Sequence, residues 1–259
     1  MKIDFKTQVV LITGGTRGIG KQIADDFVNL GATVILTGTN AKNIKLLNED
    51  AISKGLKKTY FCVDFLSKQS VNDFLTELEA VPVIDVLVNN AGINENNSIN
   101  KTNLKDWEEI VEVNLSAPFK IIRLISNKMI SKNYGKIINI GSVFSKVSME
   151  KRSIYSATKF GLHGLTMGVS NDLARYNVMV NTLSPGFVMT DLTMKNLNSD
   201  ERDTLSKLIP IKRLAQTNEI SKTVLFLASK HNTYLTGQNI IIDGGFTNVW
   251  LQIRSSITF

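Results

Sequence analysis

The sequence contains few of the residues that form disulfides and metal sites. Among its 259 residues there are one cysteine and two histidines. Cys62 alone excludes an internal disulfide, and it suits a reducing cytoplasm, where we expect the protein to act. His163 and His231 are too few and too far apart in sequence to suggest a metal site.

Long hydrophobic runs are also missing. No apolar stretch approaches the roughly 20 residues that a membrane-spanning helix requires, so no membrane is expected as a partner. The first apolar run, Val9 to Ile12, is short and stops at glycines, which is unlike a signal peptide.

Acidic residues are outnumbered by basic ones. The 30 lysines and arginines and 23 aspartates and glutamates give a net charge of +7. The basic residues are spread along the chain without a block, and no nucleic-acid motif accompanies them. Net charge alone indicates non-specific association rather than a function. We therefore predict no nucleic-acid partner and a mild attraction for anionic substrates.

What the chain does have is a regular alternation of apolar β-branched runs and helical patterns. Strands are expected at 9–12, 34–36, 60–63, 84–88, 137–140, 178–183 and 239–242, and helices at 18–30, 41–54, 67–78, 104–131, 154–175 and 218–228. Pro118 falls inside the longest helix and can bend it. Uninterrupted apolar strands between helices indicate a parallel sheet covered on both faces. The predicted fold is α/β, a single-domain doubly wound parallel sheet (Rossmann fold) over residues 1–259, with ligands at the carboxyl ends of the strands.

One segment, about 189–210, departs from this alternation. It is polar, with scattered methionines and leucines, and it follows Ser184-Pro185-Gly186. Two interpretations stay open: a mobile cover over the substrate, or a helical excursion on the surface.

A glycine-rich turn joins the first expected strand to the first expected helix, which is the context in which such a turn binds a dinucleotide. Its residues are Thr13, Gly14, Gly15, Thr16, Arg17, Gly18, Ile19 and Gly20. Gly14 allows the tight turn, Gly18 lets the backbone approach a pyrophosphate, and Gly20 allows close helix packing. The free N–H groups and the dipole of the helix N-terminus then favour the phosphates.

The end of the second expected strand selects the cofactor. An NAD site usually has an Asp or Glu there, which binds the ribose 2′-hydroxyl. This chain has Thr37-Gly38-Thr39-Asn40 at that place, without an acid, and it has Arg17 in the glycine turn. Arg17, with Thr39 or Asn40, favours a 2′-phosphate. We therefore predict NADP(H) as the cofactor rather than NAD.

Tyr155 and Lys159 are four residues apart on an expected helix, so they lie on one face. We expect the ammonium of Lys159 to lower the pKa of Tyr155 from its usual value of about 10, which suits a general acid in carbonyl reduction. Ser142 follows the strand that ends at Ile140 and can hydrogen-bond a carbonyl oxygen as charge develops. Each residue also has an ordinary interpretation, as a half-buried aromatic, a surface charge and a loop serine.

With these residues in this order, the chain resembles the short-chain dehydrogenase/reductase family over nearly its whole length. The resemblance implies that Ser142, Tyr155 and Lys159 are catalytic, and that Asn114 holds a water in a proton relay to the lysine. It also implies cofactor contacts by Asp64, Phe65, Asn90, Ala91, Gly92, Pro185, Gly186, Val188 and Thr190, besides Tyr155 and Lys159. No metal is implied.

Within the family, the motifs read most like those of bacterial 3-oxoacyl-acyl-carrier-protein reductases. This resemblance implies NADPH-dependent reduction of a 3-oxoacyl thioester to its 3-hydroxy form, by a homotetramer or, alternatively, a homodimer. Two other functions stay open. One is a reductase or dehydrogenase of another carbonyl, such as a sugar derivative, a steroid-like ring or a small ketone, and the other is a non-catalytic NADP sensor.

Three features depart from that likeness. Where those reductases dock the carrier protein through basic residues, this chain has Asn127 and Asn171, with Lys128 and Arg175 close by. Arg152, three residues before Tyr155, can meet an anionic substrate or be solvated. The segment from Asn248 to Phe259 is longer than those reductases lead us to expect.

Overall fold

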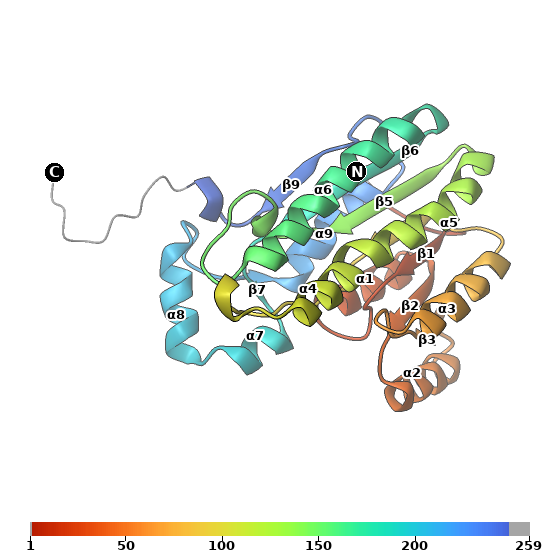
Figure 1. Cartoon of the computed structure of the whole chain (residues 1–259). Coiled ribbons are helices and arrows are strands. Elements are labelled where there is room, and N and C mark those ends of the chain that lie inside the picture. The colour runs from red at the N-terminus through yellow and green to blue at the C-terminus, as the bar shows by residue number, and fades with distance from the viewer. Residues whose placement is uncertain (1, 249–259) are drawn as a thin grey trace, which may run out of the picture.

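The centre of the molecule is one parallel sheet. The computed structural model describes residues 2–248, and its seven-stranded sheet has the order β3-β2-β1-β4-β5-β6-β9 (Figure 1). The strands are β1 (Val9–Ile12), β2 (Thr33–Gly38), β3 (Lys58–Cys62), β4 (Val86–Asn89), β5 (Gly135–Ile140), β6 (Val178–Pro185) and β9 (Asn239–Ile242). All neighbouring pairs run parallel. Because the order reverses between β1 and β4, the predicted doubly wound fold is confirmed.

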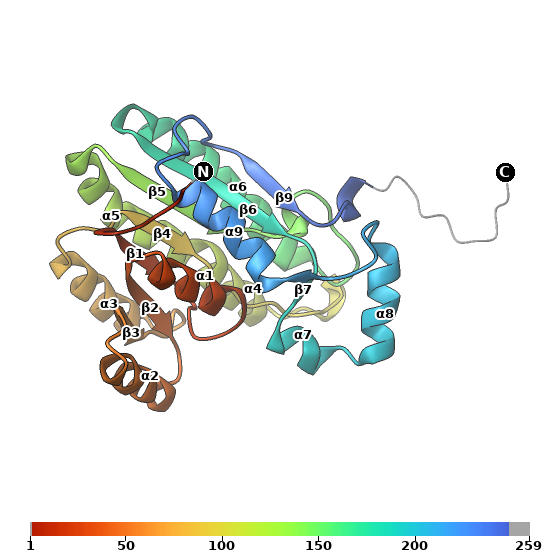
Figure 2. The ribbon, with the colours of Figure 1, turned by 180° about the vertical axis from the view of Figure 1, so that it is seen from behind.

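Helices cover both faces of this sheet (Figures 1 and 2). Six of the helices are α1 (Gly18–Asn29), α2 (Ala41–Ser53), α3 (Lys68–Ala80), α5 (Ala117–Lys132), α6 (Ser153–Leu173) and α9 (Thr217–Ala228). Alternate strand residues point to opposite faces, so Val10 and Ile12 join the core under α1 and α9, whereas Leu11 joins the core under α3 and α5. Both faces of each central strand are therefore buried, which explains the unbroken apolar runs. Within residues 2–248, no helix has the length and apolar character that crossing a membrane requires.

The long helix expected over 104–131 is interrupted. It consists of α4 (Leu104–Val111), a π-helical turn (Glu112–Ser116) and then α5. Pro118 lies in the first turn of α5. Because proline has no backbone N–H, the carbonyl of Asn114, four residues earlier, loses its regular helical donor. The proline thus changes the hydrogen bonding upstream of itself rather than simply bending the helix.

The segment that the sequence sets apart, about 189–210, forms two short helices, α7 (Asp191–Asn196) and α8 (Ser199–Leu208). They stand at the end of the sheet to which the strand arrows point (Figure 1). Their flanks, β7 (Val188–Met189) and β8 (Ala215–Gln216), pair with each other as a separate two-stranded sheet. The sequence analysis missed these strands because two residues carry no periodicity.

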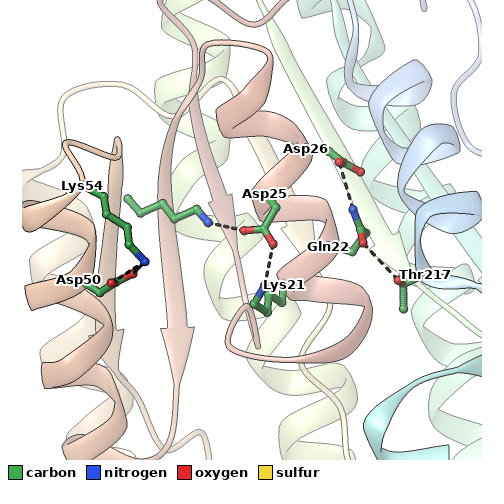
Figure 3. A network of polar contacts seen from close by, with 8 residues as sticks. Lys21, Gln22, Asp25, Asp26, Asp50, Lys54 and Thr217 are labelled. Carbon is green, nitrogen blue, oxygen red and sulfur yellow. Dashed lines mark hydrogen bonds and ion pairs between the residues drawn. The ribbon is translucent and has the colours of Figure 1, made fainter.

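Helix α1 is tied to its neighbours by polar contacts (Figure 3). Asp25 accepts from Lys21 at 2.8 Å and from Lys58 of β3. On the other side of the helix, Asp26 accepts from Ser221 of α9 at 2.6 Å. These contacts join α1, whose first residues belong to the glycine turn, to β3 on one side and to α9 on the other.

Candidate active site

The glycine turn has the shape of a phosphate cradle. Gly18 has a φ of +55°, in the left-handed region that favours glycine. A Cβ on Gly20 would lie 2.3 Å from the carbonyl oxygen of Gly14, so any side chain there would force the turn and helix apart. The first N–H groups of α1 have no helical partner. The turn therefore fits a pyrophosphate, as the sequence predicts.

Asn90 holds this turn in shape. Its side-chain Nδ2 donates to the carbonyl oxygens of Thr13 and Gly14, both at 3.0 Å. In return, Thr13 Oγ1 accepts the backbone N–H groups of Asn90 and Ala91, each at 3.0 Å. The sequence predicts that Asn90 contacts the cofactor. Both N–H donors of its side-chain amide, however, already bind carbonyl oxygens of the turn.

The remaining predicted cofactor residues divide into exposed and buried groups. Arg17, Thr39 and Asp64 are exposed, and Thr39 and Asp64 follow the adjacent strands β2 and β3. The side chains of Phe65 and Val188, in contrast, are buried in the two apolar cores. Because burial of these apolar side chains is favourable, their direct contacts with a cofactor are restricted to backbone atoms.

The segment from Pro185 to Thr190 lies beside the glycine turn. A Cβ on Gly18 would be 3.7 Å from Cγ2 of Thr190, the residue that caps α7. Gly186 packs so closely on Asp243 that its Cβ would lie 2.8 Å from the Cα of that residue. The start of α7 therefore lies directly beside the glycine turn, at the place where the sequence predicts the cofactor. Residues Thr16, Gly15 and Ile19 pack the turn onto β2 and the core.

Tyr155 and Lys159 are close together, as the helical spacing predicts. The ammonium nitrogen of Lys159 lies 5.5 Å from the centroid of the Tyr155 ring and donates to the carbonyl oxygen of Ile140 at 2.8 Å. Ser142, two residues beyond the end of β5, is buried and interacts with the Tyr155 hydroxyl. Gly92 completes the group, since a Cβ there would lie 3.7 Å from Lys159 Nζ. The three predicted catalytic side chains therefore converge at the carboxyl edge of the sheet.

The expected lowering of the Tyr155 pKa is wrong for the protein alone. Burial raises the pKa of Tyr155 above 10.0, while Ser142 and Arg152 act in the opposite direction. Lys159 does not offset this effect, because burial lowers its own pKa to about 8 and it loses its proton before Tyr155 does. Tyr155 therefore carries its proton at neutral pH, which suits a proton donor.

Asn114 is buried, and its side chain is fully engaged. Its Oδ1 accepts from Ile93 N–H at 2.9 Å, and its Nδ2 donates to Ile93 O at 2.9 Å and to Thr158 Oγ1 at 3.2 Å. The side chain has no donor left for a water. Its Oδ1 and the main-chain carbonyl, which Pro118 deprives of its regular helical donor, are the atoms of Asn114 that can accept a hydrogen bond from one.

A buried serine cluster behind Ser142 was not found from the sequence. Ser145 Oγ donates to the Ser142 carbonyl at 2.6 Å and lies 2.7 Å from Ser184 Oγ. Asn239 Nδ2 donates to Ser145 Oγ at 2.9 Å, and its Oδ1 accepts from Ser184 at 2.6 Å. The cluster links Ser142 to β6 and β9. Its only signal in the sequence is the presence of serines on otherwise apolar segments.

Two buried lysines should make the stability of the protein depend on pH. Burial lowers the pKa values of Lys136 and Lys159 from 10.5 to about 8. Between these values the unfolded chain holds protons that the folded protein has released, so stability increases with pH in this window. Above pH 10.0 the direction reverses, because Tyr60, Tyr134 and Tyr155 have raised pKa values.

We expect the free energy of unfolding to increase between about pH 8 and pH 10, by up to about 1.4 kcal/mol per pH unit for each lysine. The melting temperature should rise with it. Melting curves of wild type, Lys136→Met and Lys101→Met check this. Lys136→Met should flatten the rise, whereas Lys101→Met, which removes an exposed charge, should leave it. Equal slopes in the two variants would contradict the assignment.

Comparisons with known proteins show the family to which the chain belongs. A family described as short chain dehydrogenase matches residues 8–201. The 3-oxoacyl-[acyl-carrier-protein] reductase FabG of Aquifex aeolicus is 38% identical over 247 residues, covering 95% of this chain and 99% of that protein. The FabG of Escherichia coli is 33% identical over 246 residues, covering 94% and 98%.

Among solved structures, a gluconate 5-dehydrogenase from Burkholderia cenocepacia in complex with NADP and tartrate has a TM-score of 0.88 and 32% identity, covering 95% of this chain and 98% of that one. ElxO with NADP bound has a TM-score of 0.85 and 27% identity, covering 93% and 99%. The chain belongs to the short chain dehydrogenase family. The predicted class, an NAD(P)-dependent oxidoreductase that acts on CH–OH and C=O groups, is thereby confirmed.

Proposed function

We propose that this protein uses NADPH to reduce the ketone of a 3-oxoacyl thioester to the 3-hydroxy form. The observation that carries the proposal is the convergence of Ser142, Tyr155 and Lys159 beside the glycine turn. Similarity to reductases of this substrate class supports the choice of substrate.

Each side chain has one role in the proposed reaction. When bound, NADPH supplies the hydride that reduces the carbonyl carbon. Tyr155, protonated at neutral pH, donates its proton to the carbonyl oxygen, while the Ser142 hydroxyl hydrogen-bonds that oxygen as negative charge develops. Lys159 binds the ribose hydroxyls of the cofactor and passes a proton back to Tyr155. The carbonyl of Asn114 holds the water that connects Lys159 to solvent.

NADP rather than NAD is supported by the residues around the predicted adenosine ribose. Thr39 is exposed after β2 and carries no charge, and Arg17 is exposed at the N-cap of α1. A 2′-phosphate would meet a cation and no carboxylate at these two positions. Structures of two relatives are described as containing NADP, which agrees with this assignment.

The carrier-protein part of the proposal has weaker support from the surface. Lys128, next to Asn127, donates its ammonium to the carbonyl oxygens of Glu79 and Val81 at 2.8 Å and 2.7 Å. The guanidinium of Arg175 lies 5.2 Å from the Tyr176 ring centroid. Because both cations have intramolecular partners, a thioester of coenzyme A is as good a candidate as a carrier-linked one.

The proposal is tested with acetoacetyl thioesters of coenzyme A and of a purified acyl carrier protein. We expect NADPH oxidation with both, and a similar kcat/KM for the two, because the carrier adds few contacts. A sugar keto acid is the second candidate substrate, favoured by the similarity to a gluconate 5-dehydrogenase. Turnover of the keto acid with neither thioester reduced would overturn the thioester assignment.

We further propose that the protein acts in the cytoplasm as a homotetramer, with a homodimer as the alternative. The exposed side chains of Trp107, Phe119, Phe160 and Met167, on α4, α5 and α6, support a subunit contact. A single cysteine suits the cytoplasmic location. A monomer mass in sedimentation at micromolar concentration would contradict the assembly. The segment 249–259, the longer end noted above, lies outside the described residues.

A further inference from the structure

The aromatic ring of Phe144 contacts both Arg152 and the phenol ring of Tyr155. Arg152 caps α6, and its guanidinium carbon lies 5.5 Å from the centroid of the Phe144 ring. The ring of Phe144 in turn meets Tyr155 in an edge arrangement with centroids 6.1 Å apart. Burial raises the pKa of Tyr155, and the positive charge of Arg152 is close enough to oppose part of that rise. Arg152 and Tyr155 therefore both lie against the ring of Phe144.

Arg152 is held in place without being neutralised. Its guanidinium lies over the Phe144 ring and donates from Nη1 to the side-chain oxygen of Asn96, an uncharged acceptor. Among residues 2–248, each ion pair within 4.0 Å involves another base, and none includes Arg152. The side chain is half-buried, and burial lowers its pKa.

A half-buried guanidinium without a counter-ion is costly to fold, because burial weakens its hydration. The position of the cation over an aromatic ring compensates part of this cost. Among residues 2–248, the one acceptor bound by the fork is Asn96, on Nη1, so the other N–H groups have no partner there and can bind a planar anion. A carboxylate has the charge and the planar shape to accept from these N–H groups.

The spacing distinguishes a carboxylate from a phosphate. A thioester substrate carries its nearest phosphate at the far end of the pantetheine arm, away from the ketone. Arg152 lies near Tyr155 instead, separated from it by a single ring. A carboxylate a few bonds from the reacting carbonyl meets this geometry, and the phosphate of a thioester does not.

We infer that Arg152 is a specificity-determining residue that binds the carboxylate of free keto acids, and that such acids are a second substrate class of this enzyme. The inference rests on the proposed NADPH-dependent reduction and extends it beyond thioesters. The added reaction is the same two-electron step. The carbonyl carbon gains a hydride from NADPH, the oxygen gains the proton of Tyr155, and NADP⁺ and a hydroxy acid are released.

The test compares one ketone with and without the negative charge. We measure kcat/KM for acetoacetate and for its neutral ethyl ester, with NADPH, in wild type, Arg152→Met, Arg152→Lys and Lys151→Asn. The readout is the ratio of the two constants, acid over ester. We expect Arg152→Met to lower this ratio roughly 10- to 100-fold, as the loss of a charge-assisted hydrogen bond predicts.

The other variants distinguish the effect of the two parallel N–H groups of the guanidinium from the effect of its positive charge. Arg152→Lys should recover only part of the ratio, because an ammonium cannot bind a carboxylate with two parallel N–H groups. Lys151→Asn removes the neighbouring exposed charge at a position with a φ of +62°, which asparagine tolerates, and should keep the wild-type ratio. An unchanged ratio in Arg152→Met, or an equal loss in Lys151→Asn, would overturn the inference.

A binding measurement separates this inference from the proposed function. If neither acetoacetate nor its ester nor acetoacetyl-coenzyme A oxidises NADPH, the proposed function fails. Calorimetric titration of tartrate into the NADP-loaded protein then decides the role of Arg152. Weaker binding by Arg152→Met than by wild type supports the carboxylate site. Equal binding, or no binding to wild type, rejects it.

Discussion

Replacing Tyr155 with phenylalanine is expected to lower kcat about 1,000-fold, since positioned proton donors contribute about 10²- to 10⁴-fold. The ring should keep its place, because its edge contact with Phe144 does not involve the hydroxyl. Ser142 would then face a developing negative charge with one hydrogen bond and no proton to give. The loss should appear in kcat, because the missing interaction is made in the transition state.

The measurement is the steady-state rate of NADPH oxidation, together with a fluorescence titration of NADPH binding. We expect the affinity for NADPH to change by less than about threefold, because Lys159 and the glycine turn are intact. Tyr134→Phe is the matched control. It removes a half-buried phenol whose hydroxyl accepts from Gln8 at 3.2 Å, away from the site. Near-normal turnover by Tyr155→Phe would remove Tyr155 from the mechanism.

Replacing Thr39 with aspartate is expected to shift the cofactor preference toward NADH by about 100-fold. Thr39 is exposed and directly follows β2, where a carboxylate accepts from the ribose hydroxyls of NADH. The same carboxylate repels the 2′-phosphate of NADPH, and like charges in close contact cost several kcal/mol. Each 1.4 kcal/mol corresponds to about tenfold in affinity.

The ratio of kcat/KM for NADPH and NADH gives the preference directly. Thr39→Asn is the control, since it has nearly the size of aspartate and no charge. We expect it to retain most of the preference for NADPH. If the ratio is the same in Thr39→Asp and wild type, the 2′-phosphate lies elsewhere and Arg17 cannot be paired with Thr39 in its recognition.

Much of the fold could be predicted because its strands are buried on both faces. The last strand was predicted at 239–242 and lies there, and the first at 9–12 likewise. The break before α5 was only partly foreseen. Pro118 marks the place in the sequence, but the π-helical turn depends on how α4 and α5 pack, which no local pattern records.

The sequence predicts which residues form the candidate site. It predicts less well how deeply they are buried and which residues hydrogen-bond them. Helical spacing placed Tyr155 beside Lys159, and strand ends placed Ser142 near both. The direction of the Tyr155 pKa was wrong, because it depends on burial by residues distant in sequence. The serine cluster escaped for the same reason, since its hydrogen bonds join Ser145 to residues 39 and 94 positions away.

The contact between Thr13 and Asn90 also bears on the order in which the chain folds. It joins residues 77 positions apart, across β1 and β4. Until those two strands are adjacent, the glycine turn lacks the partner that shapes it, and non-local pairing of this kind forms slowly. Partly folded chains should therefore be unable to capture the nucleotide, so the nucleotide selects and stabilises the finished fold. Appearance of NADPH affinity during refolding would accordingly report completion of the central sheet rather than its beginning.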